Sequence, residues 1–144
     1  MDSTCAMGWW GFAYVLGPNY NGGMEADNYA RAYDASMKAM SLKDRCTPKE
    51  QGLIDAMALR YAKEAPTDRS PLDKAYSEAL RALSAKHPED ADIAALFAES
   101  LMDQHPWDLW NKDGTKKPWT PEIIAALFIQ KHLVRGLSFG AVKG

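Results

Sequence analysis

Three histidines and one short acidic segment are the residues whose types could support catalysis or metal binding. His87 and His105 each fall where a helix is expected to end, and there an imidazole interacts favourably with the helix dipole. Asp103, His105 and Asp108 combine carboxylate and imidazole ligands in one segment, but nothing in their spacing defines a coordination geometry. The sequence contains no GxSxG segment, no glycine-rich phosphate loop and no H-E-x-x-H motif. We therefore predict no catalytic residues, no metal, no cofactor and no enzymatic activity.

A tryptophan-rich segment, 105–119, is the more informative candidate site. It contains Trp107, Trp110 and Trp119, and three indole rings in a loop would expose a large apolar area to water. Either these rings fold back over the last helix pair, or they form the rim of a binding surface. Tyr20 and Asn21 are a similar candidate surface at the other end of the molecule, with ordinary turn residues as the alternative.

Composition predicts one folded domain. The chain has 144 residues, of which 47% are hydrophobic and 25% charged, and this excludes an intrinsically disordered protein. A formal net charge of −2 argues against a nucleic-acid partner and against an anionic membrane surface. All 19 acidic residues lie within 1–122, whereas 123–144 carries only basic charge.

Two further features bound the location of the protein. No apolar run approaches the roughly 20 residues that a membrane-spanning helix requires. Cys5 and Cys46 are isolated thiols without metal-ligand spacing, so they are free cysteines or, alternatively, one disulfide. Their number leaves the compartment open and favours the cytoplasm.

Helix signals dominate the sequence. The segments 47–50, 70–73 and 120–122 each begin with Ser or Thr followed by Pro, and each places an acidic residue in the first turn. Strand signals are nearly absent, because no stretch alternates apolar and polar residues. An all-α fold is therefore predicted, with helices at about 4–16, 28–42, 48–64, 71–86, 90–104 and 121–135.

Large and small residues recur at fixed offsets in these helices. In the first, third and fifth segments a large residue is followed by a small one, and three positions later by Tyr or Leu. The second and fourth segments have alanines seven residues apart. Small residues let two helices approach closely, so Gly11, Ala58 and Ala98 are expected to be buried against the partner helix. The packing positions are Trp10, Gly11, Tyr14, Ala32, Ala39, Met57, Ala58, Tyr61, Ala75, Ala82, Phe97, Ala98 and Leu101.

This pattern resembles the tetratricopeptide repeat family, whose first helix carries W-x2-L-G-x2-Y and whose second carries spaced alanines before a proline. The resemblance covers residues 5 to about 127, and segment 5–19 is similar to bacterial proteins with these repeats. It implies an α-solenoid of stacked antiparallel helix hairpins that binds a protein or peptide in a groove. The intervals from Trp10 to Met57 and from Met57 to Phe97 are 47 and 40 residues. The family period is about 34 residues, so HEAT-like repeats of roughly 40–47 residues are the competing interpretation.

The ends of the sequence suggest a fragment of a longer protein. We expect a repeat domain over 1–127 and an atypical basic tail or capping helix over 128–144. Because Trp9 and Phe12 lack a preceding helix and 123–129 is apolar throughout, a homodimer through the terminal helices is predicted.

The predicted function is a non-catalytic scaffold that binds a partner segment. Its alternatives are a helical accessory module of an enzyme, or a small-molecule or metal site around the loop from Trp107 to Trp119. The candidate partner-binding residues are Tyr20, Asn21, Asp55, Arg60, Glu99, Asp103, Trp107, Trp110 and Trp119.

Overall fold

The computed structural model describes residues 3–128, and this part of the chain is all-helical, as predicted. No strand occurs among these residues; two isolated bridges pair Asn19 with Gly22 and Trp110 with Lys116. The helices are α1 (Ala6–Leu16), α2 (Asn28–Ser41), the 3-10 helix η1 (Lys43–Arg45), α3 (Pro48–Leu59), α4 (Ser70–Lys86) and α5 (Ala91–Gln104). Residues 120–128 are also helical. The predicted tail, apart from its first residue, lies outside the described residues.

Local capping chemistry sets most helix starts. At α3, Thr47 and Glu50 form a complete capping box, with the Glu50 amide donating to Thr47 Oγ1 at 3.3 Å. At α5, the Asp90 carboxylate accepts from the backbone amides of the first turn. At α4 the prediction was off by one position, because Ser70 lies inside the helix and donates its hydroxyl to Asp68.

The third helix ends earlier than predicted, at Leu59 rather than near residue 64. The reason is tertiary. The Arg60 carbonyl accepts from Arg69 Nη2 at 3.1 Å, and Tyr61 Oη donates to the Ala13 carbonyl at 2.6 Å. These long-range contacts replace the next turn of helix.

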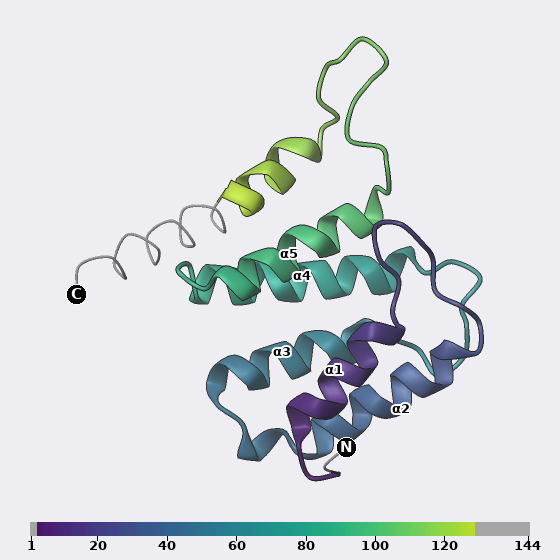
Figure 1. Ribbon diagram of the computed structural model, residues 1–144, viewed down its shortest axis with the longest axis vertical. Coiled ribbons are helices and arrows are strands. Elements are labelled where there is room, and N and C mark those ends of the chain that lie inside the picture. Colours follow the sequence, from purple (N-terminus) through teal and green to yellow (C-terminus); the bar gives the residue numbers. More distant parts are fainter. Residues whose placement is uncertain (1–2, 129–144) are drawn as a thin grey trace, which may run out of the picture.

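Successive helices pack side by side. Helices α1 and α2 form a hairpin, α3 lies against both α2 and α4, and α4 pairs with α5 (Figure 1). The loop from α5 to the helical residues 120–128 projects away from this stack (Figure 1). Sequential packing of adjacent helices is compatible with an α-solenoid.

Helices α3 and α5 run in the same direction. An ion pair joins Lys49, at the start of α3, to Asp90, at the start of α5, with Nζ and Oδ2 2.5 Å apart. A second pair joins Arg60, just beyond the end of α3, to Asp103 in the last turn of α5 at 3.2 Å. Alternate helices are therefore parallel, as stacked hairpins require.

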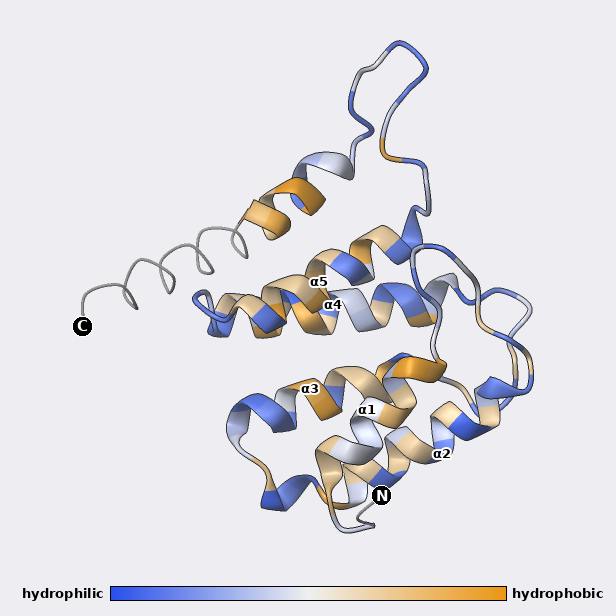
Figure 2. Cartoon of the chain, viewed as in Figure 1, coloured by the Kyte–Doolittle hydropathy of each residue, from blue (hydrophilic) through white to orange (hydrophobic). Residues whose placement is uncertain are grey.

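The core is built mainly from alanine, leucine, isoleucine and aromatic side chains on the inner faces of these helices, and Figure 2 shows the apolar stripes on α4 and α5. Arg60 departs most from this pattern. Arg60 is only 2% exposed and is the largest fully buried side chain in the described part of the chain.

The small-residue pattern is only partly confirmed. Ala32, Ala39, Met57, Tyr61, Phe97, Ala98 and Leu101 are buried, whereas Trp10, Tyr14 and Ala75 are partly buried. Ala82 is exposed, so its predicted burial at a helix contact is wrong: it lines an open cavity between α3 and α4.

The predicted close approaches at Gly11 and Ala58 are also wrong. Both residues are only partly buried, and a Cβ at Gly11 would meet nothing within 4 Å. The close approach of α3 to α4 is made instead at Gly52, where a Cβ would lie 2.4 Å from Leu83 Cδ1. Six residues, nearly two turns of helix, separate Gly52 from Ala58, so the close approach lies nearer the start of α3.

Candidate functional site

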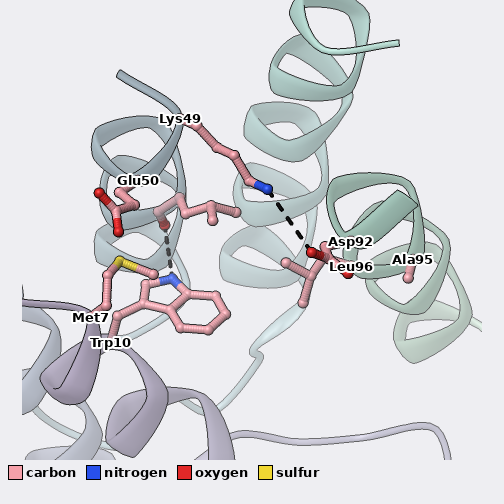
Figure 3. Close-up of a pocket in the computed structure, with 8 residues that line it drawn as sticks. Met7, Trp10, Lys49, Glu50, Asp92, Ala95 and Leu96 are labelled. Atoms are coloured by element: carbon pink, nitrogen blue, oxygen red, sulfur yellow. Dashed lines mark hydrogen bonds and ion pairs between the residues drawn. The ribbon is translucent and has the colours of Figure 1, made fainter. Parts of the chain in front are cut away.

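A groove opens between the three parallel helices α1, α3 and α5, and we call it the inter-helix groove. Its volume is about 500 Å³. The indole of Trp10 lies in it, donating from Nε1 to the Leu53 carbonyl at 3.1 Å (Figure 3). The lining residues are Met7, Trp10, Lys49, Glu50, Leu53, Asp92, Ala95 and Leu96. The groove thus has an apolar floor with charged residues at its rim.

The rim charges of the inter-helix groove are largely engaged with the protein. Lys49 lies between Asp90 and Asp92, at 2.5 and 3.9 Å, and hydrogen bonding to Asp90 raises the pKa of the ammonium. The Glu50 carboxylate completes the capping box of α3, and this lowers its pKa. A ligand would therefore gain most of its contact from the apolar floor.

A second cavity, of about 320 Å³, lies where the α1–α2 loop meets the end of α5. We call it the loop pocket. Segment 18–23 lines one part of it, and Pro106 and Trp107 line an adjoining part. Arg69, Asp73 and Asp103 supply its charged groups.

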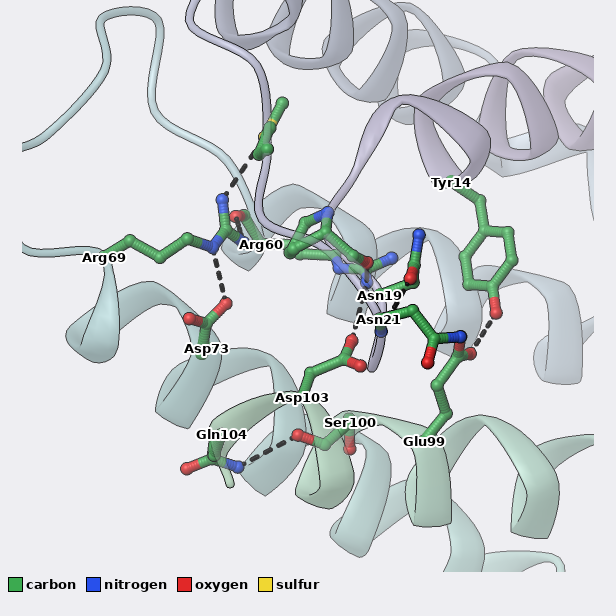
Figure 4. Close-up of polar contacts among 12 residues, drawn as sticks. Tyr14, Asn19, Asn21, Arg60, Arg69, Asp73, Glu99, Ser100, Asp103 and Gln104 are labelled. Atoms are coloured by element: carbon green, nitrogen blue, oxygen red, sulfur yellow. Dashed lines mark hydrogen bonds and ion pairs between the residues drawn. The ribbon is translucent and has the colours of Figure 1, made fainter. Parts of the chain in front are cut away.

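Two arginine–aspartate pairs lie beside the loop pocket (Figure 4), and Arg69, Asp73 and Asp103 line it whereas Arg60 does not. Arg60 Nη2 donates to Asp103 Oδ2 at 3.2 Å and to the Pro18 carbonyl at 2.8 Å. Arg69 Nε donates to Asp73 Oδ1 at 2.7 Å. Because the Arg60 and Asp103 side chains are only 2% and 5% exposed, this pair is far from solvent screening.

Aromatic rings surround the Arg60 guanidinium. Its Cζ lies 4.6 Å from the centroid of Tyr76, 5.3 Å from that of Tyr14 and 5.9 Å from that of Tyr61. Rings at these distances offer their negative faces to the cation and offset part of its lost hydration. The sequence pattern placed Tyr14 and Tyr61 at packing positions without revealing that a charge lies between them.

Asp103 has an unusual electrostatic environment. Burial raises the pKa of its carboxyl group to about 7, an effect that the neighbouring Arg60 opposes and that Glu99 and Asp73 reinforce. Its Oδ1 has no hydrogen-bond partner among the described residues. A carboxyl group in a cavity whose pKa is raised to near 7 is a common property of functional sites.

The tryptophan segment divides between the two predicted roles. Trp119 folds back: its ring stacks on His105, with centroids 3.9 Å apart, and its Nε1 donates to the Asp108 carbonyl at 2.7 Å. Trp107 and Trp110 remain 75% and 52% exposed. Covering the last helix pair is therefore the role of Trp119 alone.

Tyr20 and the tryptophan segment are not at opposite ends of the molecule, contrary to expectation. The rings of Tyr20 and Trp107 are in contact, with centroids 4.9 Å apart. The loop after α1 folds across the end of α5 because the Pro18 carbonyl is bonded to Arg60. Asn21 lies in the same loop and lines the pocket.

The four charged residues predicted to line a groove do not do so together. Arg60 and Asp103 are buried as a pair, and Glu99 accepts a hydrogen bond from the Tyr14 hydroxyl. Asp55 is exposed and pairs with Lys43 at 2.6 Å, outside both cavities. Helical register predicted one shared face for these side chains, but α3 ends before Arg60, so its side chain does not follow that register.

The weak metal candidates are also separated. Asp103 is directed towards Arg60, His105 stacks on Trp119, and Asp108 pairs with Lys117 at 3.1 Å. Within residues 3–128, no group of three His, Cys, Asp or Glu side chains is arranged to hold a metal ion. In this structure Cys5 and Cys46 are both free thiols, so the disulfide alternative is not formed here.

Arg69, Asp73, Met7 and Leu96 line the cavities but were not predicted as site residues. Met7 and Leu96 could have been found, because Met7 lies on the same helix as Trp10 and Leu96 lies on α5, which runs parallel to it. Arg69 and Asp73 have no such signal, since an i, i+4 ion pair is an ordinary feature of a helix start.

The geometry defines an all-α protein of packed helix hairpins with an apolar groove and a separate polar pocket. In comparisons with known proteins, no family model, curated protein or solved structure matches the chain. The resemblance to tetratricopeptide repeats therefore remains a prediction. Over the described residues, no helix combines the length and the apolar character needed to cross a membrane.

Proposed function

We propose that this protein is a non-catalytic helical-repeat scaffold that binds a segment of a partner protein in the inter-helix groove. The observation that supports this proposal is that three parallel helices, α1, α3 and α5, together line one groove. Stacked hairpins present such a surface to peptides, and an apolar floor with a charged rim is the usual composition of a peptide site.

The chemistry of the groove favours an apolar anchor residue in the partner. Trp10 and Leu96 offer apolar surface from opposite helices, and the Trp10 Nε1 donor is already used by the Leu53 carbonyl (Figure 3). With the rim charges also engaged, burial of an apolar side chain is the largest gain available to a ligand.

The test is selection of peptides from a random display library with the full chain, followed by affinity measurement by calorimetry. Ala95→Arg places a bulky charge in the groove and should weaken binding of the selected peptides at least about tenfold, a loss of about 1.4 kcal/mol. Ala85→Arg is the matched control, because Ala85 is exposed on α4 outside the groove. Equal affinity of the two variants would refute binding in the groove.

We also propose that two copies associate through the C-terminal helical residues. Leu127 and Phe128 are 40% and 53% exposed. The N-terminal residues no longer support such an interface, because Trp9 and Phe12 pack against the core cluster that includes α2. Light scattering with size-exclusion chromatography tests the state: a monomer near 16.0 kDa at micromolar concentration contradicts the dimer.

A further inference from the structure

One ion pair in the lining of the loop pocket keeps both a donor and an acceptor. Arg69 has five N–H donors, of which three are used by Asp73, by Met24 Sδ and by the Arg60 carbonyl. Two N–H groups of Arg69 are therefore left for a ligand. Asp73 accepts from Arg69 Nε through Oδ1 at 2.7 Å, and within the described part of the chain its Oδ2 is left as an acceptor. The pair thus offers a donor next to an acceptor.

Two asparagines of segment 18–23 add neutral groups to the same lining. Over the described residues, Asn21 forms one hydrogen bond, in which its backbone amide donates to Asn19 Oδ1 at 2.9 Å. Its own carboxamide can therefore donate and accept, and Asn19 keeps two N–H donors. A ligand that only donates or only accepts would leave some of these groups without water and without a partner, which is costly.

The charges of the lining are compensated within the protein. The side chains of Arg69 and Asp73 are 14% and 16% exposed and pair with each other. Asp103 pairs through Oδ2 with Arg60, and its Oδ1 is buried, so neither oxygen is presented to a ligand. No uncompensated charge selects an ion of either sign, and this favours a neutral ligand.

Aromatic and proline rings supply the apolar part of the lining, which includes Pro18 and Pro106. The rings of Tyr20 and Trp107 are in contact, with centroids 4.9 Å apart and a 39° angle between their planes. Trp107 is nevertheless 75% exposed, so much of its indole surface stays uncovered. Its φ of 59° is rare for a bulky residue, and such strain is concentrated at functional sites. A flat apolar surface therefore stands beside neutral donors and acceptors.

We propose that the loop pocket binds a neutral pyranose sugar, which packs one face of its ring on Trp107 and hydrogen-bonds through its hydroxyl groups to Arg69 and Asp73. The C–H groups on a pyranose face pack against an indole, whereas each hydroxyl at the ring edge can donate and accept. Neighbouring hydroxyl groups match the adjacent donor and acceptor of the Arg69–Asp73 pair.

The size of the loop pocket agrees with this ligand. Its volume of about 320 Å³ lies at the small end of the range for small-molecule sites, which suits one or two sugar rings. A flat aromatic ligand would cover Trp107 equally well, but it would leave the polar groups of Arg69 and Asp73 unpaired. The pocket shares no lining residue with the inter-helix groove, so the sugar site goes beyond the proposed scaffold function.

The test is a calorimetric and NMR titration of the full chain with the methyl pyranosides of glucose, galactose and mannose. Methyl glycosides of glucosamine and glucuronate are the charged counterparts, and tetrahydropyran-2-methanol has the ring without its ring hydroxyls. We expect at least one neutral glycoside to saturate the site and to shift the Trp107 indole signal. It should bind at least about fivefold more tightly than either charged sugar, and tetrahydropyran-2-methanol should not saturate.

Two disaccharides, methyl cellobioside and methyl lactoside, distinguish the source of the sugar. Affinity equal to that of the single sugar supports a free monosaccharide or one terminal residue. Tighter binding of a disaccharide supports a glycan chain whose second ring also contacts the pocket.

Trp107→Ala is the decisive variant, because Trp107 is exposed and its loss should leave the fold intact. It should reduce the affinity for the bound glycoside at least about tenfold, whereas Trp107→Phe, which keeps a flat ring, should recover most of that loss. Trp110→Ala is the matched control from the same loop, since Trp110 is also exposed but lies outside the pocket. This control should bind as the parent does.

Three results would overturn the assignment. The first is that no neutral glycoside saturates the protein up to about 50 mM, a concentration that reveals even weak binding. The second is tighter binding of a charged sugar or of tetrahydropyran-2-methanol than of every neutral glycoside. The third is unchanged affinity in Trp107→Ala, which would show that the indole is not part of the site.

Discussion

Two ion pairs join the same helices, α3 and α5, in opposite environments. Lys49–Asp90, at the rim of the inter-helix groove, has side chains 37% and 21% exposed, whereas Arg60–Asp103, beneath the loop pocket, has side chains 2% and 5% exposed. Solvent screens the first pair, so removing either of its members should change the free energy of unfolding only slightly. The second pair depends on mutual compensation, since a buried charge without its partner is costly. Loss of one partner should therefore affect stability little at the start of α3 and α5 and strongly at their end.

The largest expected effect comes from removing one partner of the buried pair. Arg60→Met leaves the Asp103 carboxylate buried without its counter-ion, and it should lower the free energy of unfolding by about 3–5 kcal/mol at pH 8. Urea denaturation measures this change. Arg45→Met, at an exposed arginine, is the control and should stay within about 0.5 kcal/mol. A loss below about 1 kcal/mol for Arg60→Met would place that pair in the same class as the exposed one.

A glycine contrast tests how tightly the buried end is packed. At Gly17 a Cβ would lie 2.4 Å from Tyr61 Oη and 3.1 Å from Arg60 Cζ, so Gly17→Ala should cost about 1–3 kcal/mol. At Gly11, within α1, the same substitution meets nothing and should stabilise the helix by roughly 0.5–1 kcal/mol. Thermal melts should show a lower melting temperature for Gly17→Ala and a higher one for Gly11→Ala. Shifts in the same direction would contradict the packing at these two glycines.

The pH dependence of stability should report the burial of Asp103. Because its pKa is raised to about 7 in the folded protein, the native state binds more protons than the unfolded state between about pH 4 and pH 7. The contribution of Asp103 to the free energy of unfolding is therefore complete at low pH and is lost as the pH rises through 7. The free energy changes by at most about 1.4 kcal/mol per pH unit.

Comparison with Asp103→Asn isolates this slope. His105, whose pKa burial lowers, acts in the opposite direction in the wild type and in the variant alike. The difference in unfolding free energy between the two proteins should therefore change with pH between 5 and 7. A constant difference over that range would show that Asp103 is ionised throughout.

The smallest effect is expected at the exposed pair. A double-mutant cycle with Lys49→Ala and Asp90→Ser should give a coupling energy below about 1 kcal/mol that weakens further in 1 M salt. Serine at position 90 keeps an acceptor at the start of α5 while removing the charge. A coupling above about 2 kcal/mol would mean that the groove rim is much less screened than its exposure indicates.

The predicted partner-binding residues fall nearer the loop pocket than the inter-helix groove. Tyr20, Asn21, Asp103 and Trp107 line the loop pocket, and none of the predicted residues lines the inter-helix groove. The inter-helix groove is lined by the parallel helices α1, α3 and α5, and of its lining residues the sequence analysis named only Trp10, as a packing residue. Its exact lining was missed, because the charged residues chosen from helical register, such as Arg60, lie where α3 has already ended. Helical register predicted the buried face of α5, but it failed for Ala58 and Ala82 inside helices and for Arg60 beyond the end of α3.

The sequence by itself determined the all-helical class, most helix boundaries and the capping at Thr47, because these depend on residues close together in the chain. Tertiary structure decided that Arg60 is buried among tyrosines and that Tyr20 meets Trp107, residues 87 positions apart. It also decided that Gly52, rather than Ala58, sits at the helix crossing. The physical reason is that helix capping and periodicity are local, whereas desolvation and ring contacts arise only when distant segments have been brought together by folding.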